Sequence, residues 1–268
     1  MNQYEKAIVE VCNVMMPYAY NGQFKAYGFS GMPIYTGVQH VSRCWNLNGQ
    51  AEAGVIGTKG VVEAYHKAIY GTKLAGPTYF EDFLNTVKND MIGNLQRDGV
   101  KGNKVYNLLI LVTDGNCHDL EMTKKLLIDM SMMPFSAVIV GVGASDFEDM
   151  EVLDADECVL TDNTGREAVR DIVQLVKYKD FAELGMRELA LEVLGEVPDQ
   201  FVDYMTMLDT DHPKLFYPDV KPTPTGIDLD VPIEEKTEEE IGTPIKIEEQ
   251  EKKGDGVTPD TTKLVELV

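Results

Sequence analysis

The chain has 268 residues, of which 44% are hydrophobic, and its 45 acidic and 24 basic side chains give a formal net charge of -21. This length suffices for one sizeable hydrophobic core, and we expect one domain rather than two. The negative charge disfavours binding to nucleic acid or to anionic lipid, because both would be repelled unless cations intervene.

The N-terminal third alternates between helix and strand patterns. Asn2, followed three residues later by Glu5, is typical of a helix N-cap, and apolar residues at helical spacing continue from there until Pro17 ends the pattern. A further helix opens at Gly76-Pro77-Thr78, with apolar residues at helical spacing as far as Met91. Between these helices we expect strands at 24–30 and 38–47 and a helix at 55–70.

Two strands farther along the chain are apolar at nearly every position. They cover residues 106–113 and 136–142. Strands of this kind belong to sheets that are covered by helices on both faces. We expect a helix at 119–130, a helix at 164–176 introduced by the capping box Thr164 to Glu167, and helices at 181–194 and 198–205.

This alternation predicts a three-layer α/β domain over residues 1–218, with a doubly wound, mainly parallel sheet. Residues 219–268 hold 14 acidic and six basic residues and no aromatic residue. This composition predicts an acidic disordered tail. The last residues, 263–268, are mildly apolar; we expect a solvated end there, with docking on the domain as the less favoured alternative.

The carboxyl edge of a doubly wound sheet is where ligands bind, and two motifs should lie there. Thr78 stands in the sequence GPT, and Asp114 follows the buried strand in the sequence TDG. A hydroxyl and a carboxylate that converge are suited to Mg²⁺, which prefers oxygen ligands. Taken singly, each has a simpler interpretation: the Thr78 hydroxyl caps its helix, and Asp114 before Gly115 forms an ordinary turn.

Two further features of the sequence bear on chemistry and location. His118 lies near Asp114 and is a candidate acid or base, although a histidine in a loop more often has no catalytic role. The four cysteines are widely spaced and form no C-x-x-C motif, which favours reduced thiols in a cytosolic protein over a disulfide framework. The longest apolar run, 137–144, is far too short to span a bilayer.

A specific set of short segments occurs in order along the chain: NQYEKAI at 2–8, YGF at 27–29, GPTYF at 76–80, LILVTDG at 109–115, VIVGVGASDF at 138–147, LD at 153–154 and RDIVQ at 170–174. On these segments the chain resembles the copine type of von Willebrand factor A domain over roughly residues 2–205. The resemblance implies a metal-ion-dependent adhesion site at the carboxyl edge, with Thr78 and Asp114 as the ligands from its second and third loops.

The first loop of that site has the pattern D-x-S/T-x-S and follows the central strand of the fold. Neither this pattern nor the strand before it occurs in the sequence, so we expect the central first strand to be missing and the site to be incomplete. Mg²⁺ releases its water reluctantly and requires charge, so we expect weak binding or none. Thr78 should then act mainly as the helix cap, and Asp114 should be solvated or paired with a backbone amide.

The resemblance implies a non-enzymatic, cytosolic protein-interaction module. A partner's acidic side chain would complete the coordination at the Thr78/Asp114 edge, and contact with the plasma membrane would be only indirect. Two alternatives remain open: a factor of the ubiquitin pathway, and a Ca²⁺-dependent phospholipid-binding copine fragment. The ligases that share this domain carry a RING finger, which needs cysteines that this sequence lacks after Cys158. A hydrolase that uses Asp114 and His118 is the least favoured possibility.

Overall fold

The computed structural model describes residues 1–98, 105–155, 158–210, 215 and 265–267. Its main element is a seven-stranded sheet with the order β3-β1-β9-β6-β7-β8, in which β4 also pairs with β1. Strands β2 and β5 form a separate sheet of two antiparallel strands. The strands are β1 (Gln23–Gly28), β2 (Gly31–Pro33), β3 (Trp45–Asn46), β4 (Gly54–Ile56), β5 (Thr72–Leu74), β6 (Asn107–Thr113), β7 (Phe135–Gly141), β8 (Val173–Lys177) and β9 (Val265–Leu267).

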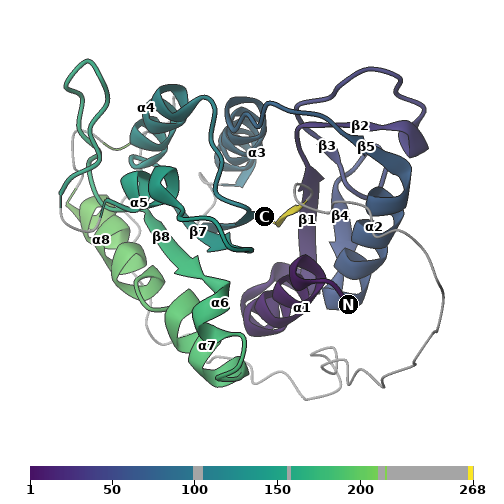
Figure 1. The fold of residues 1–268 in the computed structure, drawn as a ribbon. Helices are drawn as coiled ribbons and strands as arrows, with labels where there is room; N and C mark the ends of the chain where they lie inside the picture. The colour runs from purple at the N-terminus through teal and green to yellow at the C-terminus, as the bar shows by residue number, and fades with distance from the viewer. Residues whose placement is uncertain (99–104, 156–157, 211–214, 216–264, 268) are drawn as a thin grey trace.

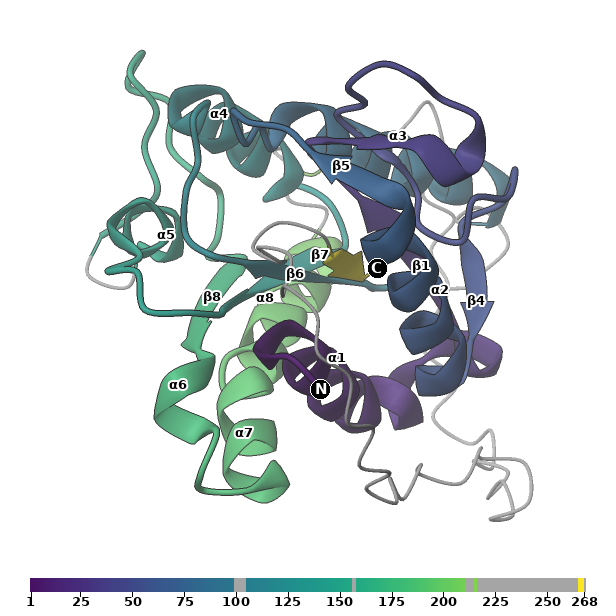
Figure 2. The same cartoon turned by 45° about the vertical axis from the view of Figure 1, so that its right-hand side comes forward.

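Helices lie on both faces of this sheet, as Figures 1 and 2 show. One hydrophobic cluster joins the sheet to α1, α2 and α7, and the other joins it to α3, α4 and α5. The helices are α1 (Gln3–Met15), α2 (Gly57–Gly71), α3 (Glu81–Asp98), α4 (Leu120–Met130), α5 (Glu148–Asp154), α6 (Tyr178–Phe181), α7 (Met186–Val193) and α8 (Val197–Asp209). Short 3₁₀ turns cover Met16–Tyr18, Tyr20–Gly22 and Ile34–Thr36.

The two apolar strands predicted from the sequence lie side by side in the interior of the sheet. β6 and β7 pair in parallel, with Ile110 opposite Val138 and Leu111 opposite Ile139. Their side chains alternate between the two clusters: Ile110 and Val138 belong to the first, and Leu111 and Ile139 to the second. Both faces of these strands are therefore dry, which explains why the sequence is apolar at successive positions.

The sheet is parallel only where β6, β7 and β8 pair. On the other side, β1 pairs in the antiparallel sense with β3, β4 and β9. The mixed α/β class and the helix-covered parallel strands agree with the predicted fold. The expectation of a mainly parallel sheet holds for this half alone.

The N-terminal helix begins as predicted, with the Asn2 side chain accepting a hydrogen bond of 2.8 Å from the Glu5 amide. The strand predicted at 38–47 is mostly wrong. Only Trp45–Asn46 pairs with β1, and Val41, which a half-buried strand would cover, is 48% exposed. Apolar residues in that segment are too sparse to bury a continuous strand face.

The helix predicted at 164–176 is wrong. Residues 173–177 form strand β8, which pairs in parallel with β7. The Asp162 side chain accepts hydrogen bonds from the amides of Thr164 and Arg166, so the apparent capping box is a turn around Asp162. A short apolar run such as 172–176 fits a buried strand and a helix segment equally well, and periodicity alone could not separate them.

The C-terminal residues also correct an expectation. Val265–Leu267 are not a solvated end: they form β9, which pairs with both β1 and β6. The less favoured alternative, docking on the domain, is what the structure shows. Residues 219–264, for which we expected disorder, lie outside the described residues. Within the described part of the chain, no helix combines the length and hydrophobicity of a membrane span.

Candidate functional site

The carboxyl ends of β6 and β7 lie next to each other, because Thr113 and Gly141 are partners in the parallel register. The loop that carries Thr78 is joined to the loop after β6 by two hydrogen bonds. The His118 amide donates to the Thr78 carbonyl at 3.0 Å, and the Thr78 amide donates to His118 Nδ1 at 3.2 Å. The structure thus brings the two predicted motifs to one edge of the sheet, which we call the Thr78/Asp114 edge.

The cap of helix α3 comes from Asp119 and not from Thr78. The Asp119 carboxylate accepts hydrogen bonds from the Phe80 amide at 2.9 and 3.0 Å and from the Glu81 amide at 2.8 Å. A carboxylate at this end of a helix satisfies amides that have no partner within the helix, and it is favoured by the helix dipole. The expectation that Thr78 caps the helix is therefore wrong, because a residue about 40 positions away does so.

The two predicted metal ligands each present a buried oxygen that lacks a partner. Among the described residues, neither Thr78 Oγ1 nor Asp114 Oδ1 makes a hydrogen bond. Thr78 is completely buried, whereas Asp114 is half-buried. The expectation that Asp114 would be solvated or paired with an amide therefore fails for this oxygen. Leaving a buried polar atom without a partner costs about 1–3 kcal/mol, so such a pair calls for an explanation.

Glycines shape the backbone around Asp114. Gly115 has a φ of +100°, and a Cβ atom added there would lie 2.7 Å from Cδ1 of Phe147. A Cβ at Gly141 would lie 2.6 Å from Cε1 of the same ring. Phe147 is almost fully buried, so its ring occupies the space that side chains at both glycines would need. The loop after β6 is therefore held against the loop after β7 by packing around one aromatic ring.

The donor set at this edge fits a hard cation only in part. Thr78 Oγ1 and Asp114 Oδ1 are oxygen donors without other partners, which is the chemistry that Mg²⁺ requires. They bring a single negative charge, and water would have to supply most of the coordination shell. Within the described ranges there is no cluster of three or more histidine, cysteine, aspartate or glutamate side chains that could hold a metal ion.

Comparison with known proteins adds an independent observation. Residues 1–213 match the family profile described as Copine. The chain belongs to the copine family. It is 38% identical over 207 residues to Protein BONZAI 1 and to Protein BONZAI 2, both of Arabidopsis thaliana, and 37% identical over 207 residues to Copine-A of Dictyostelium discoideum. The family resemblance inferred from the motifs is thereby confirmed.

These matches cover 76% of this chain but only 34% of the two BONZAI proteins and 33% of Copine-A. The copine chain described here thus spans about a third of the length of these curated relatives. What the whole relatives do does not transfer directly to it.

Beside the candidate metal ligands, the Thr78/Asp114 edge of this copine domain contains groups with structural roles. His118 is exposed, and its Nδ1 accepts the Thr78 amide, so the proton of a neutral ring is on Nε2. The Cys117 amide donates to Asp149 at 3.2 Å, which ties the loop after β6 to helix α5. Burial raises the pKa of the Cys117 thiol to about 12, so this cysteine is a poor nucleophile at neutral pH. Cys12, Cys117 and Cys158 have free thiols, as expected.

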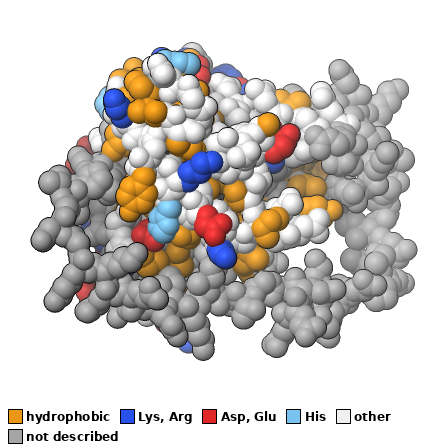
Figure 3. All heavy atoms as spheres, turned by 90° about the vertical axis from the view of Figure 1, so that its right-hand side faces the viewer, with side chains coloured by type: hydrophobic (Ala, Val, Ile, Leu, Met, Phe, Trp, Pro, Cys, Tyr) orange, Lys and Arg blue, Asp and Glu red, His pale blue; other side chains and the backbone are white. Residues whose placement is uncertain are grey.

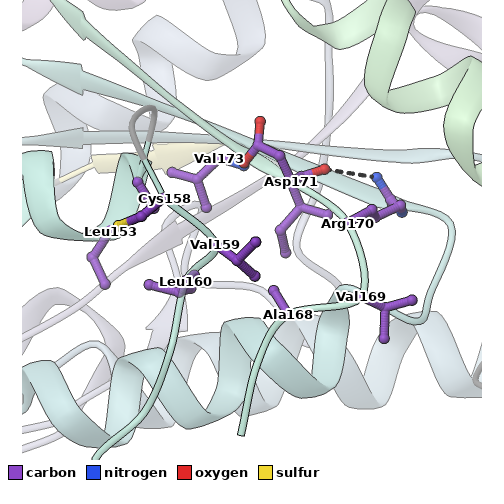
Figure 4. A pocket seen from close by; sticks show the side chains of 11 residues that line it. Leu153, Cys158, Val159, Leu160, Ala168, Val169, Arg170, Asp171 and Val173 are labelled. Carbon is purple, nitrogen blue, oxygen red and sulfur yellow. Dashed lines mark hydrogen bonds between the residues drawn. The ribbon is translucent and has the colours of Figure 1, made fainter. Parts of the chain in front are cut away.

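A separate hollow of about 350 Å³ lies beside the start of β8, between α5 and the segment 158–160. Figure 4 shows its mainly apolar lining, with Arg170 and Asp171 as the polar residues. The Arg170 guanidinium donates to the carbonyls of Met133 at 2.8 Å and Phe135 at 2.6 Å. These hydrogen bonds give the guanidinium a structural role. It also lies over the rings of Tyr106 and Tyr204.

The face over α2 and β4 carries exposed apolar residues. Tyr20 is 81% and Tyr70 is 86% exposed, and Ile56 is also exposed. Figure 3 shows that apolar side chains on this face form several separate groups among polar and charged ones. Scattered exposed apolar residues are normal on protein surfaces. The Thr78/Asp114 edge is therefore the better candidate site.

Proposed function

We propose that this copine domain is a non-enzymatic, cytoplasmic protein-interaction module whose docking edge is the Thr78/Asp114 edge. The observation that carries the proposal is the pair of buried oxygens, Thr78 Oγ1 and Asp114 Oδ1, that have no hydrogen-bond partner among the described residues. Two such groups at the carboxyl edge of an α/β sheet stand where this class of fold binds ligands.

The ligand that fits these oxygens is a divalent cation shared with a partner protein. Mg²⁺ held there would be a Lewis acid with most of its shell open, and a partner's carboxylate would add the second negative charge that the site lacks. The chain's own residues hold the geometry: Asp119 fixes the start of α3, His118 joins the two loops, and Gly115 lets the backbone turn beside Phe147. In the absence of the partner, we expect Mg²⁺ affinity on the order of millimolar or weaker.

Calorimetric titration with Mg²⁺ tests the cation part of the proposal. Asp114→Asn and Thr78→Val should each abolish the weak binding of the unaltered chain, since the first removes the only negative charge of the two donors and the second removes the hydroxyl oxygen. Asp146→Asn is the matched control, because Asp146 is an exposed carboxylate on the neighbouring loop after β7. Binding that is unchanged in Asp114→Asn, or equally weakened in Asp146→Asn, would place the cation elsewhere.

Affinity capture tests the interaction part. The full chain, Asp114→Asn and Asp146→Asn are each immobilised and exposed to cell extract, once with Mg²⁺ and once with a chelator. We expect proteins that are retained by the full chain and by Asp146→Asn in Mg²⁺, and that are lost with the chelator or with Asp114→Asn. If the same proteins are retained under all conditions, the Thr78/Asp114 edge is not the docking surface.

The cytoplasmic location in this proposal is supported by the free thiols of Cys12, Cys117 and Cys158, of which the first two are buried. Roles in the ubiquitin pathway or in Ca²⁺-dependent phospholipid binding are implied by the family resemblance alone. No contact described above favours either, so we do not propose them for this chain.

A further inference from the structure

The centre of the sheet contains a slot one strand wide. β1 and β6 do not pair with each other in the described sheet; β9 lies between them and is antiparallel to both. Figure 2 shows this short strand in yellow, between β1 and β6. The segment comes from the far C-terminal end of the chain, so the middle of the sheet is completed by its last residues.

The slot is lined by apolar side chains from both layers. On one side, Ala26 of β1 and Ile110 of β6 belong to the cluster formed with α1 and α2. On the other side, Leu111 of β6 belongs to the cluster formed with α3 and α4. Backbone amides and carbonyls along such an edge have little access to water, so an empty slot would leave them without partners at a substantial cost. The slot therefore requires an extended strand.

The described residues of the present occupant pair with only part of the slot. β9 has three residues, whereas β1 has six and β6 has seven. Its register pairs are two with β1 and three with β6, so much of both edges lies outside them.

The residue types of β9 also fit imperfectly. Leu267 stands opposite Ala26 and Ile110, but Glu266 stands opposite Tyr27 and Leu111. Strands within a helix-covered sheet are apolar at nearly every position, and a glutamate departs from that pattern.

We propose that the slot between β1 and β6 is a strand-acceptor site, and that the chain's own C-terminal strand, Val265–Leu267, occupies it as an exchangeable plug. The site recognises its ligand by backbone hydrogen bonds along two strand edges and by apolar side chains at successive positions, which is the chemistry of strand addition. The class of segment it accepts is extended, apolar and without proline. This inference does not depend on the Thr78/Asp114 edge, because it requires no cation.

Hydrogen exchange in the full chain tests the occupant. Glu266→Pro removes an amide and cannot be accommodated within a central strand. The amides of β1 and β6 should then exchange roughly tenfold faster or more, which is the change expected when their hydrogen bonds are lost. Glu249→Pro is the matched control, since it makes the same substitution in the acidic tail outside β9. Equal protection in Glu266→Pro and Glu249→Pro would overturn the proposal.

A synthetic peptide of residues 259–268 tests the exchange. Added to the Glu266→Pro chain, it should restore the protection of β1 and β6 in a saturable manner, whereas a peptide of scrambled sequence should not. Failure of the matched peptide to restore protection in a folded Glu266→Pro chain would contradict an acceptor site.

Two further measurements keep the proposal testable if Glu266→Pro does not fold. Glu266→Val keeps the amide and makes the plug apolar, so these amides should exchange several-fold more slowly, and the chain should take up less of the labelled peptide than the unaltered chain does. Faster exchange in Glu266→Val would contradict the assigned register.

Light scattering distinguishes the source of the strand. A monomer with protected β1 and β6 supports the plug from the same chain, whereas protection that appears only with dimerisation would assign the strand to a second copy.

Discussion

The clearest prediction concerns the start of helix α3, where the structure assigns the cap to Asp119 and leaves Thr78 without a hydrogen bond. Asp119→Ala removes the acceptor for the amides of Phe80 and Glu81. Loss of an N-cap side chain costs about 1 kcal/mol, with a range of about 0.5–2 kcal/mol. Removing a carboxylate from the positive end of the helix adds about 0.3–1 kcal/mol. Phe80 is completely buried, so water cannot readily replace the lost acceptor.

The expected loss for Asp119→Ala is therefore about 1–3 kcal/mol in the free energy of unfolding. For a domain of this size, that corresponds to a fall in Tm of about 2–12 °C. Asp119→Asn keeps one oxygen acceptor and should lose about half as much. The matched variant is Thr78→Val, which preserves the shape of the side chain and removes a buried hydroxyl that has no partner. It should change stability by less than about 0.5 kcal/mol, or stabilise the chain.

Urea unfolding in the presence of a chelator measures both variants without interference from a bound cation. Hydrogen exchange at the amides of Phe80 and Glu81 provides a local readout, which should accelerate in Asp119→Ala and not in Thr78→Val. If Thr78→Val costs as much as Asp119→Ala, then Thr78 is the cap after all and the assignment to Asp119 is wrong.

Two other predictions follow from single contacts. Gly141→Ala places a Cβ 2.6 Å from the buried Phe147 ring and should cost about 1–3 kcal/mol in thermal unfolding. Gly54→Ala, where a Cβ would meet no atom within 4 Å, should stay within about 0.5 kcal/mol; similar losses would refute the packing argument. Hydrogen bonds from Thr164, and then from Arg166, lower the pKa of Asp162. The stability that Asp162 contributes is therefore complete above its unfolded pKa of about 4 and is lost as the pH falls below that value. Asp162→Asn should make the pH dependence of the unfolding midpoint shallower below about pH 4, and parallel curves for the two proteins would contradict this.

The sequence was informative where one physical requirement dominated. β6 and β7 are apolar on both faces because each face packs against a different cluster. The apolar run that ends in Thr113-Asp114-Gly115 therefore indicated a buried strand followed by a loop. The convergence of the Thr78 loop with the Asp114 loop also followed from the parallel sheet, and the hydrogen bonds between Thr78 and His118 confirm that the two loops meet. Whether they bind a cation stays a prediction.

Errors arose where the deciding partner is distant in the chain. Thr78 to Glu81 looks like a complete capping box, but Asp119 reaches the same amides from another loop, and no local pattern reveals that competition. Residues 172–176 are apolar without a clear period, and only the neighbouring edge of β7 makes their end a strand. The pairing of the C-terminal strand was not predicted as the favoured outcome for the same reason. Three residues after a long acidic tail carry little signal, and their pairing depends on an edge formed more than 150 residues earlier.

The slot and the Thr78/Asp114 edge are connected through β6, although each proposal rests on its own observations. Val112 pairs with Val265, and Asp114 follows Val112 by only two residues. A strand in the slot therefore supports the end of β6 just before the candidate ligand Asp114. The other edge of β6 is paired with β7 as far as Thr113 and Gly141. Emptying the slot would release one edge of β6 and leave the other paired. It follows that the loop of Asp114 should stay joined to the loop of Thr78 when β9 is displaced, because His118 still connects them, but the position of the Asp114 carboxylate should be less restricted. A cation site made of two oxygens depends strongly on how well those oxygens are held in place, so the occupancy of the slot is a condition that any measurement of Mg²⁺ affinity has to hold constant.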